Sequence, residues 1–270
     1  FQIIQDISGD SINDIIIGFG GGNECVYAIN GVTGTQIWSF GDTVNYSNGD
    51  INGIDVKRDW NGDEYPDVLV SASGNEYTGE GRFSVYLLDG KTGGKIWQID
   101  QSAQKKMKDG IISLENGGAV CSHPSGSSSG EVFGFDKMGN IIWTFPTSKV
   151  GWGITEIENI GGQASSDLIA SDIGGNVYAI DGETGSQLWN TSIGNQFIEN
   201  VFIIPDINNS GVDDIVIDAI TTNIHVLEGS TGNAIWSNFT GGNILGVGIL
   251  GDLNNDGNPA CSYCYVARWG

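Results

Sequence analysis

Four stretches of the chain place oxygen-bearing side chains at one fixed spacing, which suits a loop that wraps around a hard cation. They read DISGDSIND at 6–14, DWNGDEYPD at 59–67, DINNSGVDD at 206–214 and DLNNDGNPA at 252–260. Aspartate, asparagine or serine fills positions 1, 3 and 5 of every stretch; aspartate fills position 9 of the first three, whereas Ala260 stands there in the fourth. These oxygens, with a backbone carbonyl at position 7, can surround one Ca²⁺, which takes roughly six to eight oxygen ligands. The predicted calcium ligands are Asp6, Ser8, Asp10, Asp14, Asp59, Asn61, Asp63, Asp67, Asp206, Asn208, Ser210, Asp214, Asp252, Asn254 and Asp256.

An Asx-rich turn without metal is the alternative interpretation of these loops. No helical pattern precedes them and no glutamate stands at position 12, because a strand-like run such as 15–17 or 68–70 follows at once. The loops therefore join two strands, unlike the loop of an EF-hand. Their recurrence in phase with a second repeat, described below, favours calcium over a plain turn.

Two further positions in the same phase lack the full oxygen pattern. Residues 115–118, Glu-Asn-Gly-Gly, predict a plain hairpin turn, and residues 159–163 precede Asp167 with too few oxygen-bearing side chains. We expect calcium at neither position. The ion is therefore predicted to stabilise particular strand connections and not to be the common purpose of the repeat.

The elements that must position these loops form a repeat of their own. The segment VYAIDGETGSQLW at 177–189 has copies at 26–38, 85–97, 132–143 and 224–236. Each copy ends in tryptophan, at positions 38, 97, 143, 189 and 236, so the steps are 59, 46, 46 and 47 residues. Alternating apolar and polar residues predict strands, and the Asp-Gly and Thr-Gly pairs predict the tight turn of a hairpin. The tryptophan needs a large apolar slot, which we expect on the face of the neighbouring sheet.

A period of about 46 residues with four strands is typical of a propeller blade. We predict one all-β domain over 1–270, a β-propeller of four-stranded antiparallel blades. It has either six blades with an incomplete last blade or is a fragment of a larger propeller, because the last repeat holds only two strand-like runs, near 244–250 and 261–266. The predicted repeats span approximately 1–46, 47–102, 103–148, 149–194, 195–240 and 241–270.

Charge and hydropathy exclude several kinds of partner. The chain has 11 basic and 33 acidic residues, a formal net charge of −22, so nucleic acid and anionic membrane surfaces are not expected partners. No apolar run approaches the length of about 18 residues that a membrane span requires. Phe1 is not a start methionine, so we expect a processed or cut chain from which a signal peptide could have been removed.

Four cysteines, Cys25, Cys121, Cys261 and Cys264, allow three pairings. An even number is compatible with an oxidising compartment. A bridge from Cys25 to Cys261 or Cys264 would support closure of a ring, and the sequence leaves the pairing open.

The two repeats resemble known families. The hairpin VYAIDGETGSQLW is similar to the tryptophan-containing repeat of pyrroloquinoline-quinone-like (PQQ-like) β-propellers. The loops DISGDSIND, DWNGDEYPD and DINNSGVDD are similar to the calcium loops of FG-GAP propellers, found in integrin α-chains and secreted microbial proteins. The resemblance implies a propeller with structural Ca²⁺ but no single function, because such families include dehydrogenases, outer-membrane assembly scaffolds, lyases and adhesion proteins.

Two enzymatic alternatives follow from the resemblance. Quinoprotein alcohol dehydrogenases carry an adjacent Cys-Cys pair, a tryptophan floor and a carboxylate base near Ca²⁺. No two cysteines are adjacent here, and Trp152 and Trp269 suit packing, so PQQ is not an expected cofactor. A calcium-dependent polysaccharide lyase needs a catalytic base, for which Lys57, Arg58 and Arg82 are the candidates near insertions.

Other catalytic constellations are missing from the sequence. His123 and His225 are the two histidines, and His225 occupies a strand position that packing explains. We therefore predict a secreted or cell-surface, calcium-stabilised binding or scaffold module without chemistry of its own. Its protein or carbohydrate partner is expected at the rim loops or central funnel, where the insertions 74–82 and 123–130 project from one rim.

Overall fold

The computed structural model of the chain is all-β. It describes residues 1–20, 24–41, 49–73, 83–101, 105–124, 128–163, 165–219, 223–241, 243–250 and 260–266. These ranges contain 22 strands and no helix, hence no helix long and apolar enough to cross a membrane. The insertion 74–82, the calcium-type loop at 252–260 except Ala260, and Trp269 lie outside the described residues.

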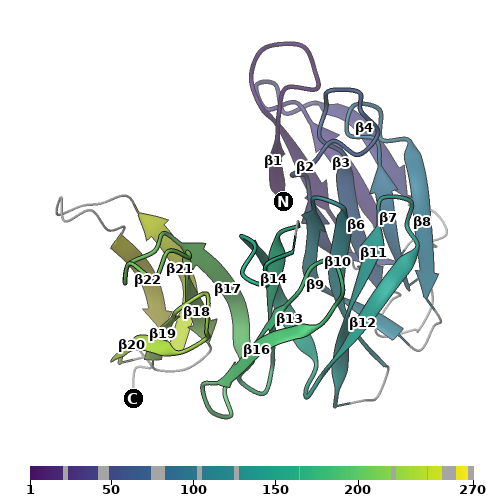
Figure 1. The fold of residues 1–270 in the computed structure, drawn as a ribbon. Helices are drawn as coiled ribbons and strands as arrows, with labels where there is room; N and C mark the ends of the chain where they lie inside the picture. Colours follow the sequence, from purple (N-terminus) through teal and green to yellow (C-terminus); the bar gives the residue numbers. More distant parts are fainter. Residues whose placement is uncertain are drawn as a thin grey trace. The chain divides into compact units, whose positions relative to one another are not determined.

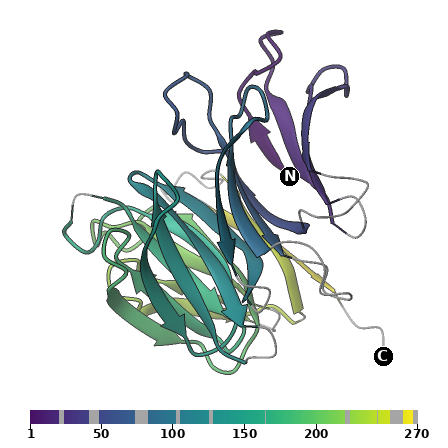
Figure 2. The same cartoon turned by 90° about the vertical axis from the view of Figure 1, so that its right-hand side faces the viewer.

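The strands form five sheets of four and one sheet of two (Figures 1 and 2). The first sheet contains β1 (Gln2–Ile4), β2 (Asp14–Gly18), β3 (Cys25–Ile29) and β4 (Gln36–Gly41). The second contains β5 (Asp50–Asp55), β6 (Val68–Ser73), β7 (Phe83–Leu88) and β8 (Lys95–Gln101). The third contains β9 (Lys105–Leu114), β10 (Gly117–Pro124), β11 (Gly130–Asp136) and β12 (Ile141–Thr147). The fourth contains β13 (Gly151–Ile157), β14 (Asp167–Asp172), β15 (Asn176–Ile180) and β16 (Gln187–Ser192). The fifth contains β17 (Ile198–Ile204), β18 (Asp214–Ala219), β19 (Asn223–Leu227) and β20 (Ala234–Phe239), and the last contains β21 (Asn243–Leu250) and β22 (Ala260–Val266).

Within each sheet the strands pair antiparallel and in chain order. This is the four-stranded, propeller-like unit that the sequence predicts, and the two strands of the last repeat also lie where expected. Residues 115–116 make the plain turn predicted between β9 and β10. A one-residue register shift recurs between the third and fourth strands, for example at Ala28/Ile29 and Ala179/Ile180, just before the hairpin turn.

The second strands of three sheets are buried along their whole length. All six residues of β6, of β14 and of β18 are buried, because neighbouring strands and sheets cover both faces. The fourth strand is an outer strand, and in β12 exposed and buried residues alternate. The apolar runs such as VLV in β6 therefore form the core, and the alternating strands form the surface.

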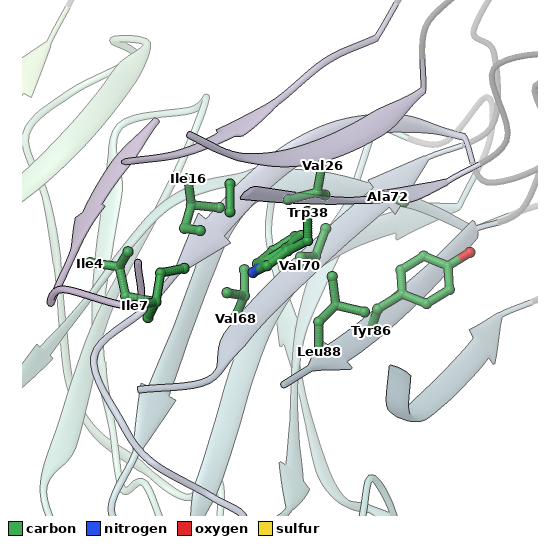
Figure 3. Close-up of a cluster of buried hydrophobic side chains, with 11 residues drawn as sticks. Ile4, Ile7, Ile16, Val26, Trp38, Val68, Val70, Ala72, Tyr86 and Leu88 are labelled. Atoms are coloured by element: carbon green, nitrogen blue, oxygen red, sulfur yellow. The ribbon is translucent and has the colours of Figure 1, made fainter. Parts of the chain in front are cut away.

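The chain divides into two compact units, which we describe separately. Unit 1 comprises 1–127 with 133–144, and unit 2 comprises 128–132 with 145–270. In unit 1, the first and second sheets share a core around Trp38, whose indole lies among Val26, Val68 and Val70 (Figure 3). A second core of unit 1 surrounds Phe133 and Phe135. Unit 2 is built on corresponding aliphatic clusters, whose centres include Ile169 and Val216.

Candidate functional site

The loop between β1 and β2 closes around the carboxylate at its first position. Asp6 Oδ1 accepts hydrogen bonds from the Gly9 and Asp10 N–H groups at 2.6 and 3.2 Å, and Oδ2 accepts one from the Ser11 N–H group at 2.6 Å. Gly9 and Ser11 have φ values of 88° and 71°. Burial acts to raise the pKa of Asp6, but these hydrogen bonds and one from Ser8 together lower it.

The same geometry recurs in the other two complete loops. Asp59 accepts from the N–H groups of Gly62 at 2.7 Å and Glu64 at 2.9 Å. Asp206 accepts from the Gly211 N–H group at 2.7 Å, a bond that lowers the pKa of its carboxyl. First-position carboxylates therefore order their own loops, as in the Asx-rich turn considered above.

The side chains at positions 3 and 5 lie beside the hairpin turn of the same sheet. In the first sheet, Asn30 Nδ2 donates to Ser8 Oγ at 2.9 Å and to Asp10 Oδ2 at 2.8 Å. In the second sheet, Asn61 Nδ2 donates to Asp89 Oδ2 at 3.1 Å. In these two sheets the loop between strands one and two therefore meets the turn between strands three and four.

The ninth-position aspartate joins those two connections. The buried Asp14 carboxylate accepts the N–H groups of Ile7 and Ser8 at 2.9 Å each, and its other oxygen accepts the N–H group of Gly31 at 3.0 Å. We call this arrangement the aspartate bracket. It fixes the start of the loop with one oxygen and the hairpin turn with the other.

Three more sheets contain the bracket. Asp67 accepts from Trp60, Asn61 and Gly90, and Asp214 accepts from Ile207 and Gly229. Asp167 accepts from Ile160, Gly161 and Gly182 at 2.7, 2.7 and 3.1 Å. The fourth sheet therefore has the bracket although its loop lacks the calcium pattern.

Burial opposes the charge of two of these carboxylates, Asp67 and Asp214. It raises the pKa of Asp67 to about 6, although hydrogen bonds from three backbone N–H groups act in the opposite direction. Burial also raises the pKa of Asp214. The bracket is thus a charged acceptor held in a poorly solvated place.

The bracket engages the carboxylate oxygens that the ninth position would offer to calcium. Asp14, Asp67 and Asp214 direct their oxygens at backbone N–H groups, whereas the first, third and fifth positions remain at the loop surface. The part of the chain that the structure describes contains no group of three His, Cys, Asp or Glu side chains close enough to hold a metal ion. Calcium with ligands at positions 1, 3, 5 and 9 of these loops stays a prediction; Asp252, Asn254 and Asp256 fall outside the described ranges.

Three of the five repeat tryptophans, Trp38, Trp97 and Trp189, reach the hairpin turn of the following repeat. The indole Nε1 of Trp38 donates to the Gly90 carbonyl oxygen at 2.9 Å, and that of Trp189 donates to the Gly229 carbonyl oxygen at 2.9 Å. Trp97 makes the same bond to the Lys137 carbonyl oxygen at 2.9 Å. Sequence reasoning found the apolar slot but missed this polar anchor.

The Thr-Gly glycine of the turn supplies the surface on which the indole lies. A Cβ atom added to Gly93 would lie 2.6 Å from the Trp38 ring, and one added to Gly232 would lie 2.4 Å from the Trp189 ring. Both glycines have positive φ, 71° and 70°. Glycine is therefore required at this turn for its backbone conformation and for the absence of a side chain.

A polar pocket opens in unit 1 between the loop that joins β5 to β6 and the turns that join β9 to β10 and β11 to β12. Its volume is about 300 Å³. Its lining residues are Lys57, Arg58, Asp59, Trp60, Glu115 and Lys137. The structure therefore brings Lys57 and Arg58 together, whereas Arg82 is outside the described residues. Sequence reasoning missed the pocket because three separate connections contribute to it.

The structure also shows the surroundings of Trp152, His225 and two of the cysteines. Trp152 packs edge-on against Phe197 with ring centroids 5.2 Å apart, which confirms a packing role. His225 is partly buried in β19 opposite Ile217 and Ser237, and burial lowers its pKa. Cys25 and Cys121 are buried, and the side chains of Cys261 and Cys264 are not among those described.

Known proteins share the repeat and the fold. Residues 128–253 match the family model described as outer membrane protein assembly factor BamB. No curated protein matches the chain in a sequence comparison. BamB from Moraxella catarrhalis is 16% identical, with 88% of this chain and 64% of that chain covered and a TM-score of 0.55.

Two other solved structures are similar to the chain at low identity. The quinohemoprotein alcohol dehydrogenase ADHIIG from Pseudomonas putida HK5 is 12% identical over 85% of this chain and 41% of that chain, with a TM-score of 0.58. BBS1N, solved in complex with ARL6DN, is 11% identical over 97% of this chain and 73% of that chain, with a TM-score of 0.62. The chain thus spans less than two thirds of the BamB and dehydrogenase chains. At such identities the likeness establishes the fold alone, and with the family model it confirms that the chain carries PQQ-like β-propeller repeats.

Proposed function

We propose that this protein is a non-catalytic binding or scaffold module, secreted or displayed at a cell surface, for a protein or glycan partner. The observation that carries the proposal is the aspartate bracket. The buried aspartates Asp14, Asp67, Asp167 and Asp214 all direct their carboxylates at backbone N–H groups, so these acids hold loops in place. A catalytic carboxylate must instead point toward a substrate.

Two of the comparisons support a binding role. BamB is described as an assembly factor, and BBS1N was solved in a complex. The dehydrogenases share the fold as well, and the adjacent cysteine pair of that family is missing from this sequence. The outer-membrane setting named for BamB is compatible with a location outside the cytoplasm.

Structural calcium is the second part of the proposal. The first-position carboxylates, with the oxygens at positions 3 and 5, remain at the loop surface, where an ion could join them. Calcium there would stiffen the edge of each sheet at which the loop meets the hairpin turn. Asp14, Asp67 and Asp214 would support the loop from within, as Asp167 does in the fourth sheet.

The dehydrogenase alternative is tested by supplying its cofactor and its metal. The protein is mixed with PQQ and Ca²⁺ and assayed for quinone absorbance and for reduction of dye acceptors by alcohols. We expect neither quinone absorbance nor turnover. Reconstituted turnover would contradict the proposal and make the chain a dehydrogenase.

The binding role is tested on the hairpin turns that join the third and fourth strands of the sheets. Photo-crosslinking residues are introduced at Val32 and Met138, exposed residues on hairpin turns, and at Gly194, which follows the opposite end of a strand. Crosslinking in the native cells should give one defined adduct from the two hairpin positions and none from Gly194. Equal labelling at all three positions would contradict a partner at this edge.

A further inference from the structure

The hairpin turn of the first sheet, residues 30–34, has the backbone of a turn that receives a tryptophan. The N–H groups of Gly34 and of Gly93, its counterpart in the second sheet, donate to the carbonyl oxygen four residues earlier at 2.9 and 2.8 Å. The φ values of the two glycines are 69° and 71°. The aspartate bracket holds both turns as well, through the N–H groups of Gly31 and Gly90. The first turn therefore presents its carbonyl oxygens and its glycine surface in the same way as the second.

No indole occupies the first turn in the part of the chain that the structure describes. A Cβ atom added to Gly93 would meet the Trp38 ring at 2.6 Å, whereas one added to Gly34 meets nothing within 4 Å. The Gly90 carbonyl oxygen accepts the Trp38 indole N–H group, whereas none of the described residues donates to the Gly31 carbonyl oxygen. Gly31 and Gly34 are both exposed. These two glycines thus form an open indole slot.

An apolar sheet face continues from the indole slot. In the second sheet the Trp38 ring packs on three fully buried aliphatic residues, which are Val68, Val70 and Leu88 (Figure 3). The aliphatic residues at the same places in the first sheet are half-buried, and they are Ile15, Ile17 and Ile29. Ile3 pairs with Ile15 and so shares its face, and Ile3 is 62% exposed. We call these four isoleucines the open face.

The junctions between successive sheets show what covers such a face. Where the first sheet meets the second, Trp38 bonds to the turn, and Phe40 on the same strand packs edge-on against Tyr86 with centroids 5.2 Å apart. In unit 2, Phe145 packs against Tyr178 in the same way at 5.4 Å, and it too follows a repeat tryptophan by two residues. The occupant is a strand with the pattern Trp-x-Phe. The open face continues this interface.

The far end of the open face carries an aromatic pair. Tyr27 occupies the place in the first sheet that Tyr86 occupies in the second, and it packs edge-on against Phe19, which is 40% exposed. We propose that the open face binds a β-strand of a partner protein that carries a tryptophan and, two residues later, a second aromatic residue. The tryptophan donates to the Gly31 carbonyl oxygen and lies on Gly34, and the second ring reaches the aromatic pair. This inference rests on the proposed function, because it names the partner chemistry of a binding module.

Tryptophan suits the indole slot better than any other side chain. It alone combines a two-ring apolar surface with an N–H donor for a backbone carbonyl oxygen. The bracket and the hydrogen bonds of the turn order the slot before binding, which lowers the entropic cost of association. A tryptophan buried in a well-packed slot is also among the side chains that most often dominate the energy of an interface. A partner strand without it should therefore bind weakly.

The first experiment uses a strand that the chain itself provides. A dye-labelled synthetic peptide with the sequence of residues 35–41, TQIWSFG, is titrated with the protein and followed by fluorescence anisotropy. We expect saturable binding, and at least about tenfold weaker binding of a peptide with alanine in place of its tryptophan, because a dominant interface side chain is worth roughly tenfold or more in affinity. Equal binding of the two peptides, or binding of neither, would overturn the inference.

Matched glycine variants locate the site. Gly34→Ala places a methyl group where the indole would lie and should weaken binding of the peptide at least about tenfold. Gly241→Ala places alanine at a similar φ, 80°, where a Cβ atom also meets nothing within 4 Å, and should bind like the unmodified protein. Urea unfolding midpoints establish that both variants are folded. Undiminished binding by Gly34→Ala, or an equal loss in both variants, would contradict the slot.

Two further readouts separate the inference from the proposed function and from self-association. With the photo-crosslinking residue at Val32, the partner segment found in the adduct by mass spectrometry should contain the tryptophan. A segment without one leaves the binding function intact and removes the inference, whereas peptide binding without any cellular adduct supports the slot and contradicts the function. The protein should be monomeric in light scattering. A dimer that is lost in Gly34→Ala would assign the slot to a second copy and overturn the inference.

Discussion

Trp38 and Gly90 are 52 residues apart in the chain, yet the indole Nε1–H of the former donates a hydrogen bond of 2.9 Å to the carbonyl oxygen of the latter. Trp38 belongs to the first sheet, and Gly90 lies in the hairpin turn of the second. The bond thus couples a side chain of one repeat to the backbone of the next. The same turn needs glycine at two places, since a Cβ atom at Gly90 would meet the Pro66 carbonyl oxygen and one at Gly93 would meet the indole.

The glycine against the indole predicts a stability difference between two alanine variants. Gly34 and Gly93 occupy the same Thr-Gly position in successive repeats, with φ of 69° and 71°. A Cβ atom at Gly34 meets nothing within 4 Å, whereas one at Gly93 meets the Trp38 ring at 2.6 Å. Gly34→Ala should cost about 1 kcal/mol of unfolding free energy through backbone strain alone. Gly93→Ala should cost about 1–3 kcal/mol more through overpacking, as read from urea unfolding midpoints. Equal midpoints would show that the indole yields without cost.

The indole bond itself can be removed with little change of shape. Trp38→Phe keeps an aromatic ring in the slot but leaves the buried Gly90 carbonyl without the Nε1–H donor. We expect a loss of roughly 1–3 kcal/mol in the free energy of unfolding, from the unsatisfied carbonyl and the smaller ring. Trp236→Phe is the control, since that repeat tryptophan is 41% exposed. A loss for Trp38→Phe that is no larger than the loss for this control would show that the hydrogen bond does not stabilise the contact between the two sheets.

The aspartate bracket predicts that asparagine cannot replace the ninth-position aspartate. In Asp14→Asn and in Asp167→Asn, an amide NH₂ group must face a backbone N–H group in place of a carboxylate oxygen. Each variant should lose about 1–3 kcal/mol of unfolding free energy. Because only the loop before Asp14 has the calcium pattern, the two losses should be similar in EDTA. A loss confined to Asp14→Asn and seen only with calcium present would mean that the ninth position serves a metal and not the loop backbone.

Calcium removal is the direct test of the loop prediction. EDTA should lower the melting temperature and added Ca²⁺ should restore it, because an ion that binds the folded state at a hundredfold excess over its Kd adds about 2.7 kcal/mol per site. Asp10→Asn removes one predicted ligand and should reduce the gain from calcium. Asp213→Asn removes the same charge from a position that is not a predicted ligand and should keep the gain. A melting curve indifferent to both reagents would remove calcium from the account.

The pH dependence of stability should reveal Asp67. Its pKa is raised from 3.8 to about 6 in the folded protein, so between these values the folded state binds more protons than the unfolded state. The contribution of Asp67 to the free energy of unfolding therefore falls as pH rises from about 4 to about 6. Asp67→Asn should lack this component. The lowered pKa values of Asp6 and Asp206 act in the opposite direction and below this window. A carboxyl resonance of Asp67 that titrates near 4 would contradict the assignment.

The sequence contained most of the fold because its information is local. The alternating residues of a segment such as 177–189 and the glycines of its turn specify a hairpin wherever they occur, and their period specifies the number of strands in a sheet. The sequence does not reveal the bracket, because aspartate at position 9 suits both a calcium ligand and an acceptor for backbone N–H groups. Asp167 was the available signal, since it keeps the ninth aspartate in a loop without the other oxygens. The pocket could not be predicted, because Lys57, Glu115 and Lys137 become neighbours only when two sheets pack.

Three repeat tryptophans each bond to a turn that follows later in the sequence, so these contacts between successive repeats all run from the N-terminal repeat to the next one. Trp38, Trp97 and Trp189 each need a carbonyl oxygen from a turn that is synthesised later. On a ribosome, the indole of a repeat that has already emerged would bond to water until the next repeat, about one repeat length of translation later, supplies the carbonyl acceptor. Synthesis should therefore fasten the sheets in order from the N-terminus, and a pause within a hairpin turn would leave the preceding tryptophan open to chaperones.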